Sequence, residues 1–270
     1  MCRLLSTGTV RPLGRMRGAS NETLLATVTG AVASDEPQRT VRAVLKTRAG
    51  ERPLHDFPTG TLSLREVAAH RLSAHLGLDV VPPTVWRDDI GAGASLQVYV
   101  ESDPTAREPV VLVAEDAVDD GLAPVLRAVL SDGTDVVLAH ELTPDVRALA
   151  LFDVLINNAD RKGGHVLCGA WEFTDGAPPR VALHAIDNGL SFHAEPKLRT
   201  VLWGFAGSPL TAQERALIER VRDDDLVPVL GDVLAAAEID ALTERATALL
   251  RNGILPLPDA DRSLVPWPPL

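Results

Sequence analysis

Residues 157–167, NNADRKGGHVL, bring together several side chains that could carry out chemistry, directly after an apolar run. Asp160 could accept a proton from a hydroxyl group, Lys162 could neutralise a phosphate charge, and His165 could bind a metal ion. A second polar turn, AIDNG, places Asp187 further along the chain. Carboxylates beside glycines that allow close backbone approach suit Mg²⁺ and phosphate oxygens. These residue types therefore predict phosphoryl transfer.

The two polar turns are expected to meet because a β-hairpin is predicted between them. Residues 165–173 and 180–187 have the apolar pattern of strands and flank the turn TDGAPP. Antiparallel pairing brings the beginning of the first strand beside the end of the second. Asp160, His165 and Asp187 should therefore converge.

Lysine is rare in this chain, and its positions are informative. Of 26 basic residues only three are lysines, and the other 23 are arginines. The lysine ammonium is a compact charge on a flexible stem, whereas the arginine guanidinium is a planar fork. Lys46 and Lys162 lie in motifs that suit phosphate chemistry. Lys197 and Arg199, in EPKLRTVLWG, are either ordinary exposed bases or substrate-recognition residues, and the sequence leaves both readings open.

Composition excludes several classes of protein. The chain has 270 residues, of which 46% are hydrophobic, so it can bury a substantial core. A net charge of −11 predicts no nucleic-acid partner. The two cysteines, Cys2 and Cys168, cannot build a disulfide framework or a four-thiolate zinc site, which fits a reducing cytosol. No apolar run reaches the ~18 residues of an integral membrane segment, and the N-terminus lacks a signal-peptide pattern. We therefore expect a cytoplasmic protein.

The N-terminal half has the pattern of a β-rich region with one helix. Ser63 and Glu66 are spaced as a capping box, which predicts where the helix begins, and Gly77 predicts where it ends. The helix is expected at residues 63–77, and the strands at 8–16, 22–32, 40–47, 80–88 and 95–102.

The C-terminal half is predicted to be mainly helical after two strands that an acidic loop separates. Thr143 is expected to cap a helix with Pro144 at its first position, and Thr211 with Glu214 forms a second capping box. The strands are expected at 109–115 and 135–141, and the helices at 144–158, 215–224 and 238–253. Charged and small residues from Glu101 to Glu108 indicate a linker between two lobes, and the predicted domains are 1–103 and 104–270.

The spacing of the polar residues matches that of the protein-kinase catalytic loop. Asp160, Lys162 and His165 stand at the offsets of the catalytic Asp, the Lys and the metal-binding Asn, and Asp187 follows one hairpin later. NNADRKGGHVL and AIDNGLSF resemble the catalytic and metal-binding loops of type II phosphatidylinositol 4-kinases. Nearly the whole chain is similar to an uncharacterised bacterial family described as phosphatidylinositol 3- and 4-kinase-like. This resemblance implies an α+β, two-lobed protein-kinase-like or phosphatidylinositol 3/4-kinase-like fold.

The same resemblance implies ATP and Mg²⁺ as cofactors and gives each candidate residue a role. Lys46 would hold the α- and β-phosphates, and Glu66 would orient it. Asp160 would be the catalytic base, Lys162 would touch the γ-phosphate, and Asp187 would hold the metal ion.

Further residues complete the implied site. His165 stands where kinases place an asparagine, so it would be a second metal ligand, and its softer nitrogen makes Mn²⁺ possible. The turn RGASN would cover the phosphates through Ser20 and Asn21. The strand SLQVYV would meet the adenine through Gln97, Tyr99 and Val100. Because the chain has no Lys/Arg-rich run, the hydroxyl acceptor is expected on a soluble protein or small molecule.

The sequence leaves open two roles for Glu66 and several functions for the protein. Glu66 could be the ion-pair partner of Lys46 or only the capping-box partner of Ser63. The protein could be a phosphotransferase, a nucleotide-binding pseudokinase or scaffold without turnover, or a phosphoinositide kinase. It could also be a metal-dependent hydrolase built on Asp160, His165 and Asp187, although that reading leaves Lys46 unexplained.

Overall fold

The computed structural model describes residues 1–16, 18, 21–31, 33, 36–171, 181–259 and 263–270. Ser20 and the predicted turn TDGAPP lie outside the described residues. The chain forms two compact units, the first made of Met1–Ala106 with Cys168–His184, the second of Arg107–Leu167 with Ala185–Leu270. Helices and antiparallel sheets occur in the chain, which confirms the α+β class.

The first unit is built from two separate pieces of the chain, whereas the predicted domains were continuous. The strand β10 (Val166–Ala170) pairs with β6 (Glu101–Ser102), and β11 (Ala182–Ala185) lies on the other side of β10. The two strands approach closely at Gly169, where a Cβ atom would lie 2.2 Å from a backbone oxygen of β6. This pairing joins Cys168–His184 to the N-terminal part of the chain.

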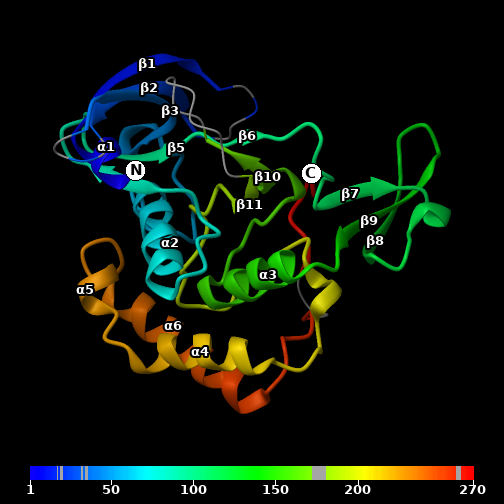
Figure 1. The fold of residues 1–270 in the computed structure, drawn as a ribbon. Coiled ribbons are helices and arrows are strands. Elements are labelled where there is room, and N and C mark those ends of the chain that lie inside the picture. Colours follow the sequence, from blue (N-terminus) through cyan, green and yellow to red (C-terminus); the bar gives the residue numbers. More distant parts are fainter. Residues whose placement is uncertain (17, 19–20, 32, 34–35, 172–180, 260–262) are drawn as a thin grey trace. The chain divides into compact units, whose positions relative to one another are not determined.

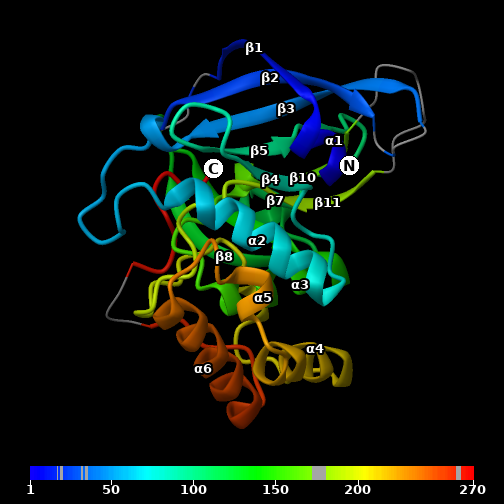
Figure 2. The same cartoon turned by 90° about the vertical axis from the view of Figure 1, so that its left-hand side faces the viewer.

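A five-stranded antiparallel sheet forms the core of the first unit (Figure 1). Its strands follow the order β1-β2-β3-β5-β4, and the helix α2 packs against β4 and β5. Figure 2 shows α2 running along one side of this sheet. The elements are α1 (Cys2–Thr7), β1 (Thr9–Arg15), β2 (Thr23–Ala31), β3 (Gln38–Thr47), α2 (Leu62–Leu76), β4 (Thr84–Arg87) and β5 (Ala94–Val98). All five predicted strands and the predicted helix are present, while α1 was not expected.

In the strand β3, the side chain of Lys46 lies on the face of the sheet that is opposite to the buried core side chains. Val41, Ala43 and Leu45 are buried on one face, and because side chains alternate along a strand, Lys46 points to the other. Thr23 of β2 and Ser95 of β5 flank Lys46 in the register.

The helix α2 ends as predicted, at Gly77 in a left-handed conformation with φ +70°. The predicted capping box at its beginning is wrong. Thr61 is the N-cap and makes no side-chain cap bond. Instead, the carboxylate of Glu51 accepts hydrogen bonds from the backbone N–H and the hydroxyl of Ser63, at 2.8 and 2.7 Å. Glu51 thus caps the helix from outside, and the Glu66 carboxylate is not used for this purpose.

In its described residues, the second unit contains a three-stranded sheet in the order β7-β9-β8 and four α-helices. Figure 1 shows α4 and α6 next to each other, and the two helices are in contact. Thr143 accepts a hydrogen bond from Val146 N, and Thr211 and Glu214 form the predicted box. The elements are β7 (Val110–Val113), β8 (Leu122–Val129), β9 (Asp135–Glu141), α3 (Pro144–Ile156), α4 (Ala212–Asp223), α5 (Val227–Leu230) and α6 (Ala236–Asn252).

The strand β8 was predicted as part of an acidic loop, and this prediction is wrong. It is an edge strand with mostly exposed or half-buried side chains, so it lacks the apolar alternation of a core strand. Pro124 adjoins a register shift in its pairing with β9. Proline lacks a backbone donor and is tolerated in a sheet at an edge or a bulge, which explains its presence here.

None of the helices in the described parts of the chain combines the length and the apolar character that a membrane crossing requires.

His184 on β11 is a buried polar residue of the first unit. Its side chain is 3% exposed, and its ring lies 5.4 Å from the ring of Trp171. Neither ring nitrogen has a hydrogen-bond partner among the described residues. Burial lowers the pKa of His184 from 6.5 to about 4, so the ring is neutral at pH 7.

This burial predicts a loss of stability in mild acid. The unfolded chain takes up a proton near the ordinary pKa of 6.5 and the folded chain only near 4, so acidification favours unfolding between these values. Between pH 7 and pH 5 the loss in unfolding free energy should be about 2 kcal/mol. Urea titrations at pH 7 and pH 5 should show that His184→Leu does not undergo this loss of unfolding free energy. His55→Leu, at a side chain that is 94% exposed, should keep it. Equal pH dependence of wild type and His184→Leu would contradict the prediction.

Candidate active site

Lys46 and Glu66 form an ion pair within the first unit. Lys46 Nζ donates to Glu66 Oε1, with the lysine side chain 21% and the glutamate side chain 3% exposed. The lysine comes from β3 and the glutamate from α2, whose first turn is capped by Glu51. Of the two readings of Glu66, the geometry favours the ion pair. A buried carboxylate that holds a partly exposed ammonium can present it to a phosphate.

The turn between β1 and β2 is described only in part. Asn21 Oδ1 accepts a hydrogen bond from the backbone N–H of Arg52 at 2.8 Å, so this amide ties the turn to the segment after β3. Its proposed contact with phosphates stays a prediction, as does that of Ser20.

The three residues predicted to meet adenine have different surroundings. The amide of Gln97 is buried and donates to Thr84 Oγ1 at 2.8 Å, which connects β5 with β4. The Tyr99 ring lies 4.9 Å from the guanidinium of Arg42, and Val100 is 5% exposed. The Gln97 side chain is thus committed to the sheet, and the backbone N–H of Tyr99 donates to the Arg42 carbonyl at 2.9 Å. Contact of these residues with adenine stays a prediction.

Two asparagines at the end of α3 hold the loop that carries Asp160. The Asn158 side chain donates to Asp153 Oδ1 at 3.2 Å and accepts from the backbone N–H of Asp160 at 2.9 Å. Asn157, with φ +54°, ends the helix, and its side chain accepts from the backbone N–H of Lys197 at 2.8 Å. Both side chains therefore hold neighbouring loops in place.

The Asp160 carboxylate lies in a partly buried, charged environment. Lys162 Nζ is 3.6 Å from Asp160 Oδ2, and the two side chains are 21% and 25% exposed. Burial raises the pKa of Asp160 above its ordinary value, the charge of Lys162 opposes this, and Asp187 adds to it. A raised pKa brings a carboxylate closer to the range in which a general base works well.

His165 connects the Asp160 loop with the Asp187 turn. Its Nδ1 lies 3.1 Å from the backbone oxygen of Asp160 and can only donate there, which directs Nε2 to Asp187 Oδ2 at 3.4 Å. The backbone N–H of Ile186 donates to the His165 carbonyl at 3.0 Å. Asp187 itself has φ +57°, in the left-handed region. The structure thus brings Asp160, His165 and Asp187 together.

Arg161 is a central residue of this arrangement that the sequence analysis did not single out. Its side chain is fully buried, and its Nε and Nη2 donate to the carboxylate of Asp153 at 2.9–3.1 Å. Nη1 donates to the Ile186 carbonyl at 2.7 Å, and Nη2 to Asn188 Oδ1 at 2.6 Å. One side chain therefore holds α3, the loop of Asp160 and the Asp187 turn. The signal was Asp153, a lone acid within the apolar run LFDVLI, which requires a buried partner.

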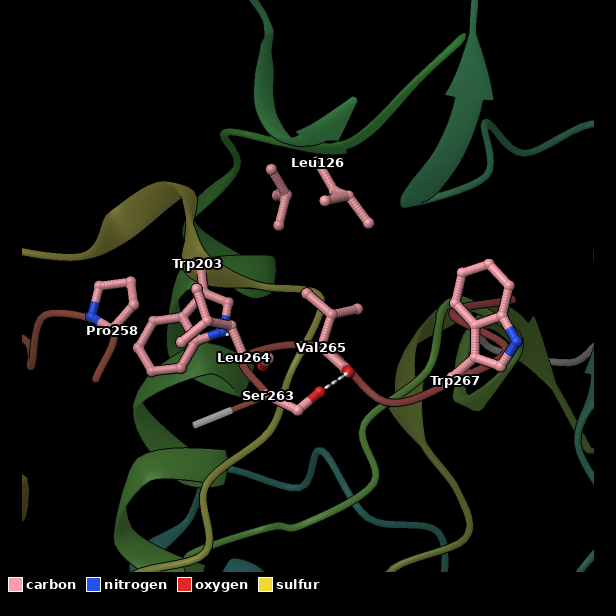
Figure 3. A pocket seen from close by; sticks show the side chains of 8 residues that line it. Leu126, Trp203, Pro258, Ser263, Leu264, Val265 and Trp267 are labelled. Atoms are coloured by element: carbon pink, nitrogen blue, oxygen red, sulfur yellow. Dashed lines mark hydrogen bonds between the residues drawn. The ribbon is translucent and has the colours of Figure 1, made fainter. Parts of the chain in front are cut away.

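The C-terminal tail also reaches the loop that carries Asp160. The backbone N–H of Gly163 donates to the Pro269 carbonyl at 2.8 Å, and a Cβ atom at Gly163 would lie 2.4 Å from Leu270. Trp203 Nε1 donates to the Leu264 carbonyl at 2.8 Å. Figure 3 shows the pocket along this tail. Its volume is about 380 Å³, and it is lined by Val125, Leu126, Trp203, Pro258, Ser263, Leu264, Val265 and Trp267.

The donor set of the second unit fits a hard divalent cation that also binds phosphate. Mg²⁺ typically takes one or two protein carboxylates and completes its coordination with water and phosphate oxygens. Asp187 offers carboxylate oxygens, and His165 Nε2 is directed to the same place. Within the described ranges, His, Cys, Asp and Glu side chains form no group of three or more that could hold a metal ion. Asp187 and His165 would therefore hold Mg²⁺ or Mn²⁺ only together with a phosphate-bearing ligand.

The fold and the site define an α+β protein with two polar loops, DRKGGH and IDNG, which the buried Arg161 joins. The chain is 41% identical over 276 residues to protein Rv2133c of Mycobacterium tuberculosis (strain ATCC 25618 / H37Rv), covering 98% of this chain and 94% of the relative. The chain belongs to the family of Rv2133c. No protein-family model matches it, so the phosphatidylinositol 3- and 4-kinase-like resemblance stays a prediction.

Two solved structures are similar over most of the chain. The Helicobacter pylori proinflammatory kinase CtkA has a TM-score of 0.45 at 11% identity, with 93% of this chain and 94% of that chain covered. The structure of hydra Fam20 with sugar has a TM-score of 0.48 at 14% identity, with 92% and 87% covered. At TM-scores below 0.5, neither likeness carries weight for the activity.

Proposed function

We propose that the protein is an ATP- and Mg²⁺-dependent phosphotransferase that moves the γ-phosphoryl group to a hydroxyl of a soluble protein or small molecule. The observation that carries this proposal is the joint fixation of Asp160 and Asp187. His165 lies between them, and the buried Arg161 holds both of their loops. Phosphoryl transfer depends mainly on positioning and charge neutralisation, which such a rigid pair of carboxylates supplies.

Each charged residue then has a role in the reaction. Asp160 accepts the proton of the acceptor hydroxyl as its oxygen attacks the γ-phosphorus and the bond to the β-phosphate oxygen breaks. Lys162, 3.6 Å from Asp160, neutralises charge on the transferred group. Asp187 and His165 would hold the metal ion, which when bound would neutralise charge on the phosphates.

The ion pair of the first unit supports the same reaction. Lys46 would bind the α- and β-phosphates, and Glu66 would hold the ammonium in place. The proposal therefore predicts that substitution of Lys46 and substitution of Asp187 each weaken the binding of ATP.

The geometry of His165 bears on the alternatives. A histidine that donates from Nδ1 to a backbone carbonyl has a fixed tautomer and a directed Nε2, as metal-binding histidines usually have. The replacement of the usual asparagine is thus compatible with a working site, and the pseudokinase reading loses its main support. A hydrolase would need a denser group of metal ligands than the described residues provide. The chain's net charge of −11 favours a soluble acceptor over a phosphoinositide in an anionic membrane.

Binding of ATP with Mg²⁺ should raise the melting temperature of the wild type. At a hundredfold excess over Kd the gain in unfolding free energy is about 2.7 kcal/mol. Lys46→Ala and Asp187→Ala should each reduce the rise by more than half, whereas Asp145→Ala, at an exposed acid of α3, should leave it intact. Each rise is measured from the variant's own ligand-free melting temperature, because Lys46→Ala also removes the cation beside the buried Glu66. An unchanged rise in both site variants would refute the proposal.

A further inference from the structure

Arg199 is held rigidly beside the catalytic loop. Its Nε donates to the carbonyl of Ala159, the residue before Asp160, at 2.7 Å. Its backbone N–H donates to the Asn158 carbonyl at 2.9 Å, and its own carbonyl accepts from Arg161 N at 3.1 Å. The segment around Arg199 thus runs alongside residues 158–161 and cannot move independently of them.

The terminal amino groups of the Arg199 side chain are not used in these contacts. Its terminal amino groups have no hydrogen-bond or ion-pair partner among the described residues, although the side chain is partly buried. Arg147, by contrast, is a partly buried arginine that makes a bidentate pair with Glu214. Arg199 does act on the Asp160 carboxylate electrostatically. With its Nε bound to the Ala159 carbonyl, the guanidinium keeps its terminal amino groups as donors for an anionic ligand.

The local charge balance indicates the sign of that ligand. Lys162 and Arg199 offset the negative charges of Asp160 and Asp187. A divalent cation at Asp187 would then leave a surplus of about two positive charges. A phosphate group carries the matching charge, and its oxygens accept two parallel N–H bonds from a guanidinium.

We infer that Arg199 is an anion-binding residue of the site and binds a phosphate group next to Asp160. The inference rests on the proposed function and extends it to a further ligand-binding residue. The phosphate has two possible sources, the γ-phosphate of the nucleotide or a phosphate carried by the acceptor. Both present the same chemistry to the guanidinium, and binding measurements separate them.

The test compares Arg199→Gln and Arg199→Lys with Lys197→Gln, a control that removes one positive charge two residues away. Lys197 is paired with Glu195 at 3.8 Å. Affinities for Mg·ATP, for Mg·ADP, and for inorganic phosphate with and without Mg·ADP are measured by calorimetry and thermal shift. Ligand-free melting temperatures and circular dichroism report whether each variant is folded.

If the γ-phosphate is the ligand, Arg199→Gln should weaken ATP about tenfold, the scale of one charge-assisted hydrogen bond, and leave ADP unchanged. If the acceptor supplies the phosphate, both nucleotides should bind normally, and Arg199→Gln should lose the response to inorganic phosphate. Either result supports the inference, and Arg199→Lys then shows whether charge alone suffices or the fork is needed.

Wild-type behaviour of Arg199→Gln toward ATP and inorganic phosphate would overturn the inference, as would an equal loss in Lys197→Gln. A wild type that binds neither nucleotide would contradict the proposed function. Its response to inorganic phosphate without nucleotide, and the loss of that response in Arg199→Gln, would still decide the role of Arg199. A wild type with no phosphate response and no preference for ATP over ADP would refute it.

Discussion

Asp160→Asn should lower the rate of phosphoryl transfer by ~10²-fold or more, the usual scale for loss of a positioned base. The amide has the shape of the carboxylate but cannot accept the hydroxyl proton. The contacts that hold the loop use the Asp160 backbone, namely its N–H on Asn158 and its carbonyl on His165. The loop should therefore keep its conformation. Transfer from γ-labelled ATP measures the rate, and the melting-temperature rise with Mg·ATP should equal that of the wild type.

The pH dependence provides a second signature of the same group. Only the ionised carboxylate can act as a base, so activity falls as pH drops through its pKa. Burial raises the pKa of Asp160 above 3.8, which places this acid limb above the range of an ordinary aspartate. The residual activity of Asp160→Asn should not show this fall at acid pH. Asp145→Asn should keep both the wild-type rate and the wild-type pH dependence. Near-wild-type transfer by Asp160→Asn would exclude Asp160 as the base.

Arg161→Met should destabilise the second unit by about 3–5 kcal/mol, because it leaves the Asp153 carboxylate buried without its guanidinium. Both side chains of this ion pair are 0% exposed, so water cannot replace the lost partner. Urea unfolding measures the effect. Arg127→Met, at a surface pair with Glu115, should cost no more than about 1 kcal/mol.

A double variant separates the contribution of Arg161 to the stability of the protein from its role in positioning the loops. Asp153→Leu with Arg161→Met removes both charges and should recover much of the stability. It should not recover transfer activity, because Ile186 and Asn188 still lack the donors that hold the Asp187 turn. Recovery of both stability and activity would show that Arg161 has no positioning role.

Much of the secondary structure follows from local patterns in the sequence. The strands β1, β2 and β3 and the helix α3 occur where alternation, Thr143 and Pro144 predict them, because side-chain periodicity and caps are local properties. The errors have local causes too. The edge strand β8 has little apolar alternation, and the Ser63–Glu66 spacing looked like a capping box although the cap comes from Glu51, twelve residues before Ser63.

The candidate site was predicted through spacing, and its supports were not. Asp160, Lys162, His165 and Asp187 could be singled out because their residue types lie at intervals that a short loop and a hairpin translate into proximity. The partners of these residues come from segments whose distance in the chain bears no relation to their distance in space. Arg161 and its partner Asp153 are eight residues apart in the chain, whereas Arg199 and its partner Ala159 are forty residues apart.

These long-range contacts depend on how complete elements pack. The buried Arg161 guanidinium needs acceptors on several sides at once. Besides the Asp153 carboxylate, these are the Ile186 carbonyl and the Asn188 amide, whose positions are set only when α3 and the Asp187 turn have come together. Backbone carbonyls have no residue identity, so no sequence pattern marks them as partners. The type and spacing of the reactive groups could therefore be read from the chain, whereas their orientation and charge environment follow from tertiary packing.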